Sequence, residues 1–493
     1  MQGTVIGSHI QEHRPSAEGV PPDPTPLFVD LDGTLLKSDL LIESILQLIR
    51  HDPWNLFRVV PWVLGGKAHF KDQVARRAEV DAGSLPYQAE FLKYLRSEAA
   101  GGRRLVLATA ANSKPAQVVA DHLGIFESVL ASDATTNLVG RRKREAVTDA
   151  SNGRAFDYAG NSVADLEIWP QARRSVLVNP DRGVESAAQK VASVEQVFDD
   201  RSMGVLPYLK AMRVHQWLKN LLVLVPLLTA HAWFDVASVF EALAAFFAFC
   251  FCASSAYLVN DLLDLAADRR HPRKRERPLA AGDVSLVRSF ALALVLFAAG
   301  LALAAALDLT FLLLVSVYLC LTTLYSFYLK KIVLLDVLVL AGLYTLRVAA
   351  GAAAIGVLVS FWLLAFCLFL FSSLALLKRC SELDSAVTRG TTVLQGRGYQ
   401  VGDAAILRTM GLTSGLMVVL VLALFIDTPE VAVNYARPQL LWLICPLMLY
   451  WVGYLWLKNE RHEMVDDPLI FSLSDPVTRT LVALMAILFL AAV

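Results

Sequence analysis

The sequence predicts a multi-domain protein in which an N-terminal α/β domain precedes an all-α polytopic membrane bundle of about nine transmembrane helices. Two observations support this prediction. Of the 493 residues, 56% are hydrophobic and only 18% are charged, whereas soluble proteins average roughly 45–50% and 25%. The charges are also unevenly placed, since they make up about 24% of residues 1–205 but about 14% of residues 206–493. A soluble first part therefore continues into a membrane-embedded second part.

Composition divides the chain further. Residues 1–25 are rich in proline near their end and are predicted to be a disordered lead-in. Residues 26–200 are predicted to form the soluble domain, and residues 201–493 the membrane domain. Basic and acidic residues number 45 each, so the net charge gives no reason to expect a nucleic-acid partner.

The soluble domain begins with a short buried strand that ends in two aspartates and a turn, P-L-F-V-D-L-D-G-T-L-L at 26–36. The D-x-D-G-T motif resembles the nucleophile loop of the haloacid dehalogenase superfamily, which implies a Rossmann-like α/β fold. The resemblance also implies that Asp30 attacks phosphorus, that Asp32 protonates the leaving group, and that both help to hold Mg²⁺. Helical patterns within residues 37–100 predict a small helical cap over this site.

Two further segments match this superfamily in its usual order. The strand R-R-L-V-L-A-T-A-A at 103–111 reaches Thr109, which matches the phosphate-binding threonine. Lys143 matches the lysine that neutralises the transferred phosphate, with Arg142 and Arg144 as alternatives. The resemblance therefore predicts a phosphate site built from separate parts of the domain.

The segment Y-A-G-N-S-V-A-D at 158–165 takes the place of the superfamily's acidic metal motif. It would supply Asn161 and Asp165 as further ligands of Mg²⁺. Asn161 stands where an acidic residue is commonest, and an amide binds Mg²⁺ more weakly than a carboxylate. A degenerate binding module without phosphatase activity is the alternative.

The second part of the chain contains nine apolar runs that reach, or nearly reach, the roughly 20 helical residues needed to cross a bilayer. They lie near residues 219–233, 237–259, 286–307, 309–328, 332–354, 357–377, 405–426, 438–457 and 474–493. If the soluble domain is cytoplasmic, 20 of the 22 basic residues after residue 205 lie on its side of the membrane. Lysine and arginine are enriched in cytoplasmic loops, so the chain is predicted to cross the inner (cytoplasmic) membrane with its C-terminus on the opposite side.

The second predicted span runs directly into N-D-L-L-D-L-A-A-D-R-R-H-P-R-K-R-E-R-P at 260–278. On a continuing helix, Asn260, Asp264 and Asp268 share one face. Hard oxygen ligands suit Mg²⁺, which commonly joins protein carboxylates to substrate phosphates. A solvated run of charges beside the membrane is the alternative interpretation.

This spacing resembles the first aspartate-rich motif of the UbiA-type intramembrane prenyltransferase superfamily. The resemblance covers about residues 206–493 and implies a nine-helix bundle with a lateral cavity that faces lipid. Lys274 and Arg277 follow the aspartates at a distance suited to phosphate oxygens. The resemblance implies a site for Mg²⁺ and diphosphate at Asn260, Asp261, Asp264 and Asp268, assisted by Lys274 and Arg277.

The chain departs from the ordinary members, which carry a second aspartate-rich motif between the sixth and seventh spans. Here the segment reads L-L-K-R-C-S-E-L-D at 376–384, and its cations suit additional phosphate. Together with Y-S-F-Y-L-K at 325–330, Asp336, L-R-V-A-A-G at 346–351 and G-R-G-Y at 396–399, it is similar to the decaprenyl-phosphate phosphoribosyltransferase branch. The resemblance implies substrate-binding roles for Tyr325, Lys330, Arg347, Lys378, Arg379 and Glu382.

Several of these residues have a plainer interpretation. Lys378 and Arg379 at a helix end are also typical of membrane anchoring, and Tyr325 suits packing as well as a site. Arg347 lies inside a span, where a charge is expensive and usually faces a polar cavity. It is therefore predicted to have a structural or catalytic partner within the bundle.

The two resemblances predict a two-step enzyme with Mg²⁺ in both domains. The membrane domain would join phosphoribosyl diphosphate to a polyprenyl phosphate, and the soluble domain would remove the 5-phosphate. An aromatic prenyltransferase with a prenyl diphosphate donor is the main alternative, and a transporter or structural membrane protein with a regulatory phosphatase-like domain is another. The sequence leaves open a homo-oligomer.

Overall fold

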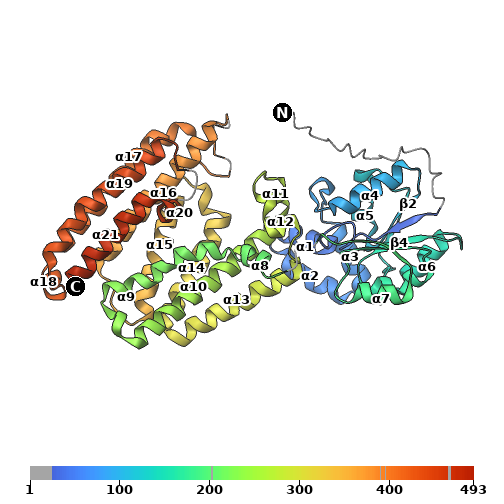
Figure 1. Ribbon diagram of the computed structural model, residues 1–493, viewed down its shortest axis with the longest axis horizontal. Coiled ribbons are helices and arrows are strands. Elements are labelled where there is room, and N and C mark those ends of the chain that lie inside the picture. The colour runs from blue at the N-terminus through green and yellow to red at the C-terminus, as the bar shows by residue number, and fades with distance from the viewer. Residues whose placement is uncertain (1–24, 201–203, 389, 395, 465–467) are drawn as a thin grey trace, which may run out of the picture. The chain divides into compact units, whose positions relative to one another are not determined.

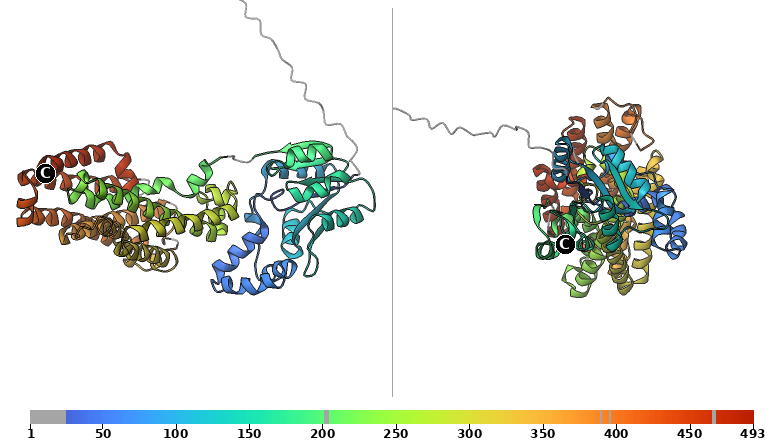
Figure 2. Two further views of the ribbon diagram at one scale, coloured as in Figure 1. Left: turned by 90° about the horizontal axis from the view of Figure 1, so that it is seen from below. Right: turned by 90° about the vertical axis from the view of Figure 1, so that its right-hand side faces the viewer.

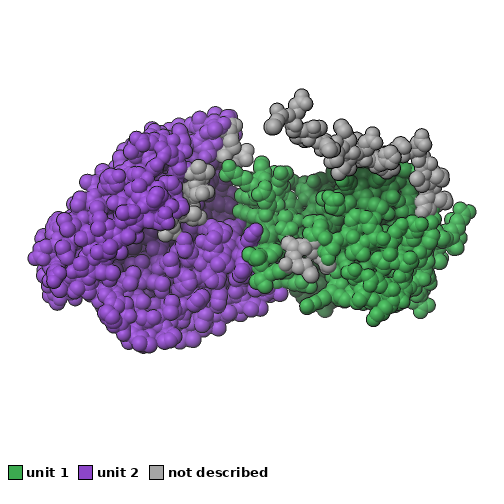
Figure 3. Space-filling model, in the orientation of Figure 1, with its two compact units in different colours: residues 1–208, 261–288 green, residues 209–260, 289–493 purple. Residues whose placement is uncertain are grey.

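A computed structural model of the protein describes residues 25–200, 204–388, 390–394, 396–464 and 468–493. The lead-in predicted for residues 1–25 lies outside the described residues except at Thr25. The chain forms two compact units (Figures 1 and 3). The first combines the residues up to Tyr208 with Asp261–Arg288, and the second contains Leu209–Asn260 and Ser289–Val493.

The first unit contains a six-stranded parallel sheet with the strand order β3-β2-β1-β4-β5-β6. The strands are β1 (Leu27–Val29), β2 (Leu105–Asn112), β3 (Ser128–Ser132), β4 (Asp157–Gly160), β5 (Ser175–Val178) and β6 (Val194–Phe198). This order confirms the Rossmann-like α/β prediction. The strand order reverses between β1 and β4, where open sheets of this kind bind ligands at the carboxyl ends of their strands.

Helices cover both faces of this sheet (Figure 1). Val29 packs in one core with α4 (Ala89–Ala100) and α5 (Ser113–Leu123), whereas Phe28 packs in another with α6 (Arg141–Ala150) and α7 (Val184–Val191). Successive side chains of a strand point to opposite faces, so β1 is buried on both sides. A central strand buried in this way holds the residues that follow it in a fixed position.

The helical insertion predicted between the first two strands is present. It consists of α1 (Leu40–His51), α2 (Asn55–Leu64) and α3 (Lys67–Ala75), followed by the short turn η1 (Ala82–Ser84). Figure 2 shows the three helices grouped beside the sheet. Asp39 caps the N-terminus of α1 by accepting a hydrogen bond from the Ile42 N–H.

Seven helices of the described residues are long and apolar enough to cross a membrane. They are α10 (Val236–Leu263), α13 (Leu286–Leu307), α14 (Leu309–Phe327), α15 (Leu335–Ala354), α16 (Phe361–Thr388), α17 (Ala404–Ile426) and α19 (Ile444–Glu460). The last two are extended at their starts by the turns η8 (Val401–Asp403) and η9 (Pro438–Leu443). The predicted membrane bundle is confirmed, but nine is only an approximate number of spans.

The first and last predicted spans differ from full-length helices. Residues near 219–233 form the 3-10 helix η4 (Val214–Leu224) and the short α-helix α9 (Val225–Thr229). Pro226 lies in the first turn of α9, and a proline cannot continue a helix that precedes it. The final segment forms α21 (Pro476–Ala492), whose 17 residues extend about 26 Å, slightly less than the roughly 30 Å of a hydrocarbon core.

Candidate active sites

The carboxyl ends of parallel strands lie at one edge of a sheet, and this edge carries the soluble domain's motif residues. Asp30 follows β1 directly, and Asn161 follows β4. The Lys143 ammonium donates to Asp30 Oδ1 at 2.6 Å and lies 3.8 Å from Asp165 Oδ1. Arg144 instead pairs with Glu167 at 3.4 Å. Lys143 is therefore in contact with Asp30, whereas Arg144 pairs with a different carboxylate.

Burial makes the two aspartates of this loop weaker acids than usual. It raises the pKa of Asp30 to about 6, against the opposing effect of Lys143. It also raises the pKa of Asp32 well above its ordinary value, with help from the negative charge of Asp39. The N–H of Leu40 donates to Asp32 Oδ1 at 2.8 Å and partly offsets this effect. A carboxyl group that keeps its proton is suited to act as a general acid.

Asn161 packs against the turn that follows Asp30. The Thr34 hydroxyl lies 3.2 Å from Asn161 Oδ1 and 3.4 Å from Asp30 Oδ2, so these two oxygens share one hydrogen-bond donor. Gly33 has a φ of +76°, and a Cβ on it would lie 2.3 Å from Asn161 Nδ2. Glycine is required there for both its backbone conformation and its small size.

Asp165 has a different environment from Asp30. Its Oδ2 accepts from the N–H groups of Asn161 and Ser162, at 3.0 and 2.9 Å, and from the Ser162 hydroxyl. Its Oδ1 accepts from the Tyr158 hydroxyl at 2.7 Å. Asp165 thus orders the loop that presents Asn161.

Thr109 and a lysine from the helical insertion complete this edge. Thr109 is fully buried in β2, and its hydroxyl oxygen accepts from the N–H of Ala111 at 2.9 Å. Lys71 of α3 donates to the Ala110 carbonyl at 2.6 Å and to Asn137 Oδ1 at 2.8 Å. Burial lowers the pKa of Lys71, and the negative charge of Asp32 opposes that shift. Sequence reasoning missed Lys71, because nothing local distinguishes it from a surface lysine.

The aspartate-rich segment departs from the continuous helix that was predicted. Helix α10 ends at Leu263, and α11 (Leu265–Arg270) begins after a break at Asp264. The prediction of one shared face for Asn260, Asp264 and Asp268 was therefore wrong. Asp264 is half-buried and pairs with Arg50 at 2.8 Å, whereas Asp268 is buried and pairs with Arg277.

Two other aspartates of this segment come together around an arginine. Arg277 Nη1 lies 3.1 Å from Asp261 Oδ1 and 2.5 Å from Asp268 Oδ2. The Lys274 ammonium lies 3.9 Å from Asp268 Oδ1, and both aspartates are buried. Asn260, in the second unit, donates to the Ser326 hydroxyl at 3.4 Å. A cation thus lies between the two carboxylates, as a bound metal ion would.

The second unit contains a buried cluster of charges centred on Asp336, at the start of α15. Arg379 Nε and Arg397 Nη1 lie 3.0 and 3.3 Å from Asp336 Oδ2, and the Tyr399 hydroxyl donates to Asp336 Oδ1. Arg379 also pairs with Glu382, and its side chain is fully buried. Its Nη2 is buried and has no hydrogen-bond partner among the described residues. The cluster therefore retains a donor that suits an anionic ligand.

Arg397 extends this cluster to Tyr325. Its Nη1 donates to the Tyr325 hydroxyl at 3.1 Å, and its Nε lies 3.4 Å from Glu382. Burial lowers the pKa of Arg397, but the neighbouring charge of Glu382 and the bond to Tyr325 give a net rise. The segments near residues 325–336, 376–384 and 396–399 thus meet in space. Lys330 and Lys378 belong to two of them and are half-buried.

Arg347 is bound to the protein through all three of its nitrogen groups. Its Nε donates to Asn220 Oδ1, its Nη2 to the Tyr318 hydroxyl and its Nη1 to the Leu343 carbonyl, at 2.9, 2.9 and 2.7 Å. Asn220 reaches it because η4 packs directly on α15 at Gly351, where a Cβ would lie 2.0 Å from the Val223 carbonyl oxygen. These bonds favour the structural alternative for Arg347.

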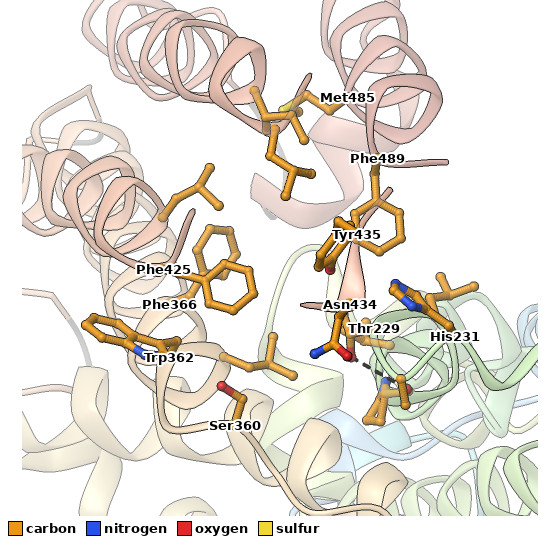
Figure 4. A pocket seen from close by; sticks show the side chains of 18 of the residues that line it. Thr229, His231, Ser360, Trp362, Phe366, Phe425, Asn434, Tyr435, Met485 and Phe489 are labelled. Atoms are coloured by element: carbon orange, nitrogen blue, oxygen red, sulfur yellow. Dashed lines mark hydrogen bonds between the residues drawn. The ribbon is translucent and has the colours of Figure 1, made fainter. Parts of the chain in front are cut away.

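A largely apolar cavity of about 700 Å³ lies at the other ends of these helices (Figure 4). Trp362, Phe366, Phe425 and Met485 line it together with a few polar side chains such as Asn434. Along α16, Phe366 and Arg379 are 13 residues apart, which corresponds to roughly 20 Å of helix. The cavity and the charged cluster are therefore separated by about two-thirds of a bilayer core.

A comparison of the sequence with protein families identifies this arrangement. The UbiA prenyltransferase family matches residues 222–474, about half of the chain. The chain belongs to the UbiA prenyltransferase family. It is accordingly an integral membrane protein of a transferase family, and its UbiA domain follows an N-terminal domain built on a six-stranded parallel sheet.

This UbiA family member resembles several known proteins. It is 38% identical to protein y4nM of Sinorhizobium fredii over 470 residues, which cover 95% of this chain and 91% of that one. It is 34% identical over 270 residues to nodulation protein NoeC of Azorhizobium caulinodans, covering 55% of this chain and 88% of that one. It is 37% identical over 191 residues to decaprenyl-phosphate phosphoribosyltransferase of Mycolicibacterium smegmatis, covering 38% of this chain and 59% of that one.

The described residues of this UbiA family member offer only two or three oxygen ligands for Mg²⁺ at each proposed site. The described part of the chain contains no group of three or more His, Cys, Asp or Glu side chains arranged to hold a metal ion. The aspartate-rich segment offers Asp261 and Asp268, and the soluble domain offers Asp30 and Asp32 with the amide of Asn161. Magnesium commonly uses one or two carboxylates and completes its shell with water and substrate phosphates. Both sets of residues fit that pattern.

Proposed function

We propose that the protein is a two-step enzyme that acts on a polyprenyl phosphate. Its UbiA domain would transfer 5-phosphoribosyl from phosphoribosyl diphosphate to the lipid phosphate and release diphosphate. Its N-terminal domain would then remove the 5-phosphate, which leaves a lipid-linked pentose. The proposal places the protein in the inner membrane with the N-terminal domain in the cytoplasm, as the distribution of basic residues favours.

The buried cluster around Asp336 is the observation that carries the proposal. It contains Arg379, which lies where ordinary members have a second aspartate-rich motif, together with Arg397 from the loop that follows, and cations suit a donor with a further phosphate. The Nη2 donor of Arg379 is the group that would meet the 5-phosphate of the ribose. Similarity to a protein named decaprenyl-phosphate phosphoribosyltransferase also supports a phosphoribosyl donor.

The first reaction needs a nucleophile, a leaving group and a place for the lipid. An oxygen of the lipid phosphate would bond to the anomeric carbon of ribose while the bond from that carbon to diphosphate breaks. Asp261 and Asp268 would hold Mg²⁺, which when bound neutralises the leaving diphosphate. Lys274 and Arg277 would bind diphosphate oxygens. The apolar cavity of about 700 Å³ would accept part of the polyprenyl chain.

The second reaction would take place around Asp30, at the carboxyl edge of the sheet. The Asp30 carboxylate would attack phosphorus, and Asp32 would give its proton to the departing 5-oxygen of the ribose. Lys143 would neutralise charge on the transferred phosphate, and Thr109 would bind one of its oxygens. Water would then release inorganic phosphate from Asp30.

Product analysis with the full-length protein tests both steps. The purified protein would be incubated in lipid nanodiscs with Mg²⁺, polyprenyl phosphate and phosphoribosyl diphosphate labelled in the ribose, and the lipid products would be resolved. We expect labelled lipid only when Mg²⁺ is present, and we expect its 5-phosphate to be lost with time. Labelled product from a prenyl diphosphate and an aromatic acceptor, but none from phosphoribosyl diphosphate, would support the aromatic prenyltransferase instead.

A further inference from the structure

The aspartate-rich segment of the UbiA domain packs against the first helix of the phosphatase-type domain. The guanidinium of Arg269 in α11 donates to both carboxylate oxygens of Glu43 in α1, at 2.6 and 2.8 Å. Its Nε donates to the Ala280 carbonyl at 2.9 Å. The side chains of Arg269 and Glu43 are only 6% and 10% exposed. A buried two-bond pair of this kind is directional, and loss of one partner leaves the other charge buried and unpaired.

One further ion pair, one hydrogen bond and one close approach lie beside this pair. Arg270 donates to Asp81 Oδ2 at 3.0 and 2.6 Å, near η1. Arg50 in α1 donates to the Leu263 carbonyl at 3.0 Å, where α10 ends. Gly282, at a φ of +79°, comes so close to Lys37 that a Cβ would lie 2.7 Å from the lysine Cβ. Contacts are therefore present at both ends of the segment as well as at its centre.

The segment held in this way contains the proposed diphosphate ligands. Asp268 directly precedes Arg269, and Arg277 links Asp268 to Asp261. Glu43 lies one helical turn from Leu40, whose N–H donates to Asp32, the proposed acid of the phosphatase. Helix α1 thus contacts both the nucleophile loop of one domain and the metal-binding segment of the other.

We propose that Glu43 is a positioning residue of the transferase reaction, which it serves from within the phosphatase-type domain. Glu43 fixes Arg269 and thereby the orientation of Asp268 toward Mg²⁺ and the donor diphosphate. The phosphatase-type domain is then a structural part of the transferase site in addition to catalysing a later step. This inference rests on the proposed function of the UbiA domain.

Kinetics of the full-length protein with Glu43→Gln test the proposal. The change removes one charge with little change of volume. Outer contacts that orient metal ligands commonly affect metal affinity or activity about 10–100-fold. We therefore expect the Mg²⁺ and phosphoribosyl diphosphate concentrations for half-maximal lipid labelling to rise about tenfold, with a smaller effect on the maximal rate. Glu90→Gln, at an exposed position of α4, is the matched control and is expected to leave both concentrations unchanged.

Exchange of the two charges is the second variant. Glu43→Arg combined with Arg269→Glu is expected to recover most of the Mg²⁺ and donor dependence that either single change loses. If Glu43→Gln leaves both half-maximal concentrations at their wild-type values, the positioning role is overturned. Equal losses in the single and the exchanged proteins would overturn it as well.

A measurement without substrates separates this inference from the proposed function. Hydrogen–deuterium exchange of residues 265–270 in the full-length protein is expected to quicken in Glu43→Gln and to stay at the wild-type rate in Glu90→Gln. Unchanged exchange in Glu43→Gln would overturn the contact, whatever the activity. If the wild-type protein forms no lipid product but residues 265–270 exchange faster in Glu43→Gln, the proposed function is contradicted and the contact is still supported.

Discussion

At the scale of single residues, each of the two proposed metal sites contains a positively charged side chain that offsets the negative charge of its carboxylates. Arg277 lies between Asp261 and Asp268, whereas Lys143 neutralises Asp30 in the soluble domain. In each case a cation of the protein offsets charge that a metal ion would otherwise have to offset alone. Loss of a single carboxylate should therefore change function more than folding.

Asp268→Asn should lower the rate of lipid labelling on the order of 100-fold. The change removes one proposed Mg²⁺ ligand and leaves the volume of the side chain. Labelled lipid would be measured beside phosphatase activity on a soluble phosphate ester, which should persist. Asp283→Asn, an exposed position of the same segment, is the control. Near-normal labelling by Asp268→Asn would show that the transferase metal lies elsewhere.

Asn161→Asp should strengthen Mg²⁺ binding at the proposed phosphatase site. Asn161 Oδ1 already shares the Thr34 hydroxyl with Asp30, so a carboxylate there would add charge at the same position. We expect the Mg²⁺ concentration for half-maximal phosphatase activity to fall about tenfold. Asn152→Asp, in a turn after α6, is the control. An unchanged or higher Mg²⁺ requirement would remove Asn161 from the metal site.

At the scale of helices and strands, the sequence was informative wherever one local pattern decided the outcome. Seven long apolar runs form helices, and a short apolar strand followed by D-x-D-G-T forms β1 and its loop. Local patterns failed where a proline or a break intervened, as at Pro226 and Asp264. They also could not reveal Lys71 or the meeting of Asp336 with Arg397, because those contacts join segments far apart in the chain.

The packing of η4 on α15 gives a prediction at this scale. Gly351→Ala would bring a methyl group to about 2.0 Å from the Val223 carbonyl oxygen, so η4 would have to move away. The movement would also stretch the bond between Asn220 and Arg347. Overpacking of this kind typically costs about 1–3 kcal/mol. Thermal unfolding in detergent would measure the loss, and Gly342→Ala, with open space around it, should show little change.

At the scale of the whole molecule, the two proposed reactions should be separable. Asp30→Asn removes the proposed nucleophile of the proposed phosphatase step but no residue of the UbiA domain, so phosphorylated ribosyl lipid should accumulate. Loss of a nucleophile usually costs several orders of magnitude in rate, and accumulation should be nearly complete. Mass spectrometry of the lipids would measure it. The same ratio of products from the wild type and Asp30→Asn would mean that the phosphatase acts on another substrate.

The first compact unit is discontinuous in sequence, because it contains Asp261–Arg288 from within the membrane half. Gene fragments cut between the two halves would separate Glu43 from Arg269 even though neither half lost a catalytic residue. A UbiA domain expressed alone would expose a buried arginine, and a transplanted phosphatase domain would lack its partner segment. The two halves should therefore be exchanged between homologous proteins as a matched pair, and chimeras that mix them should need compensating changes at positions 43 and 269.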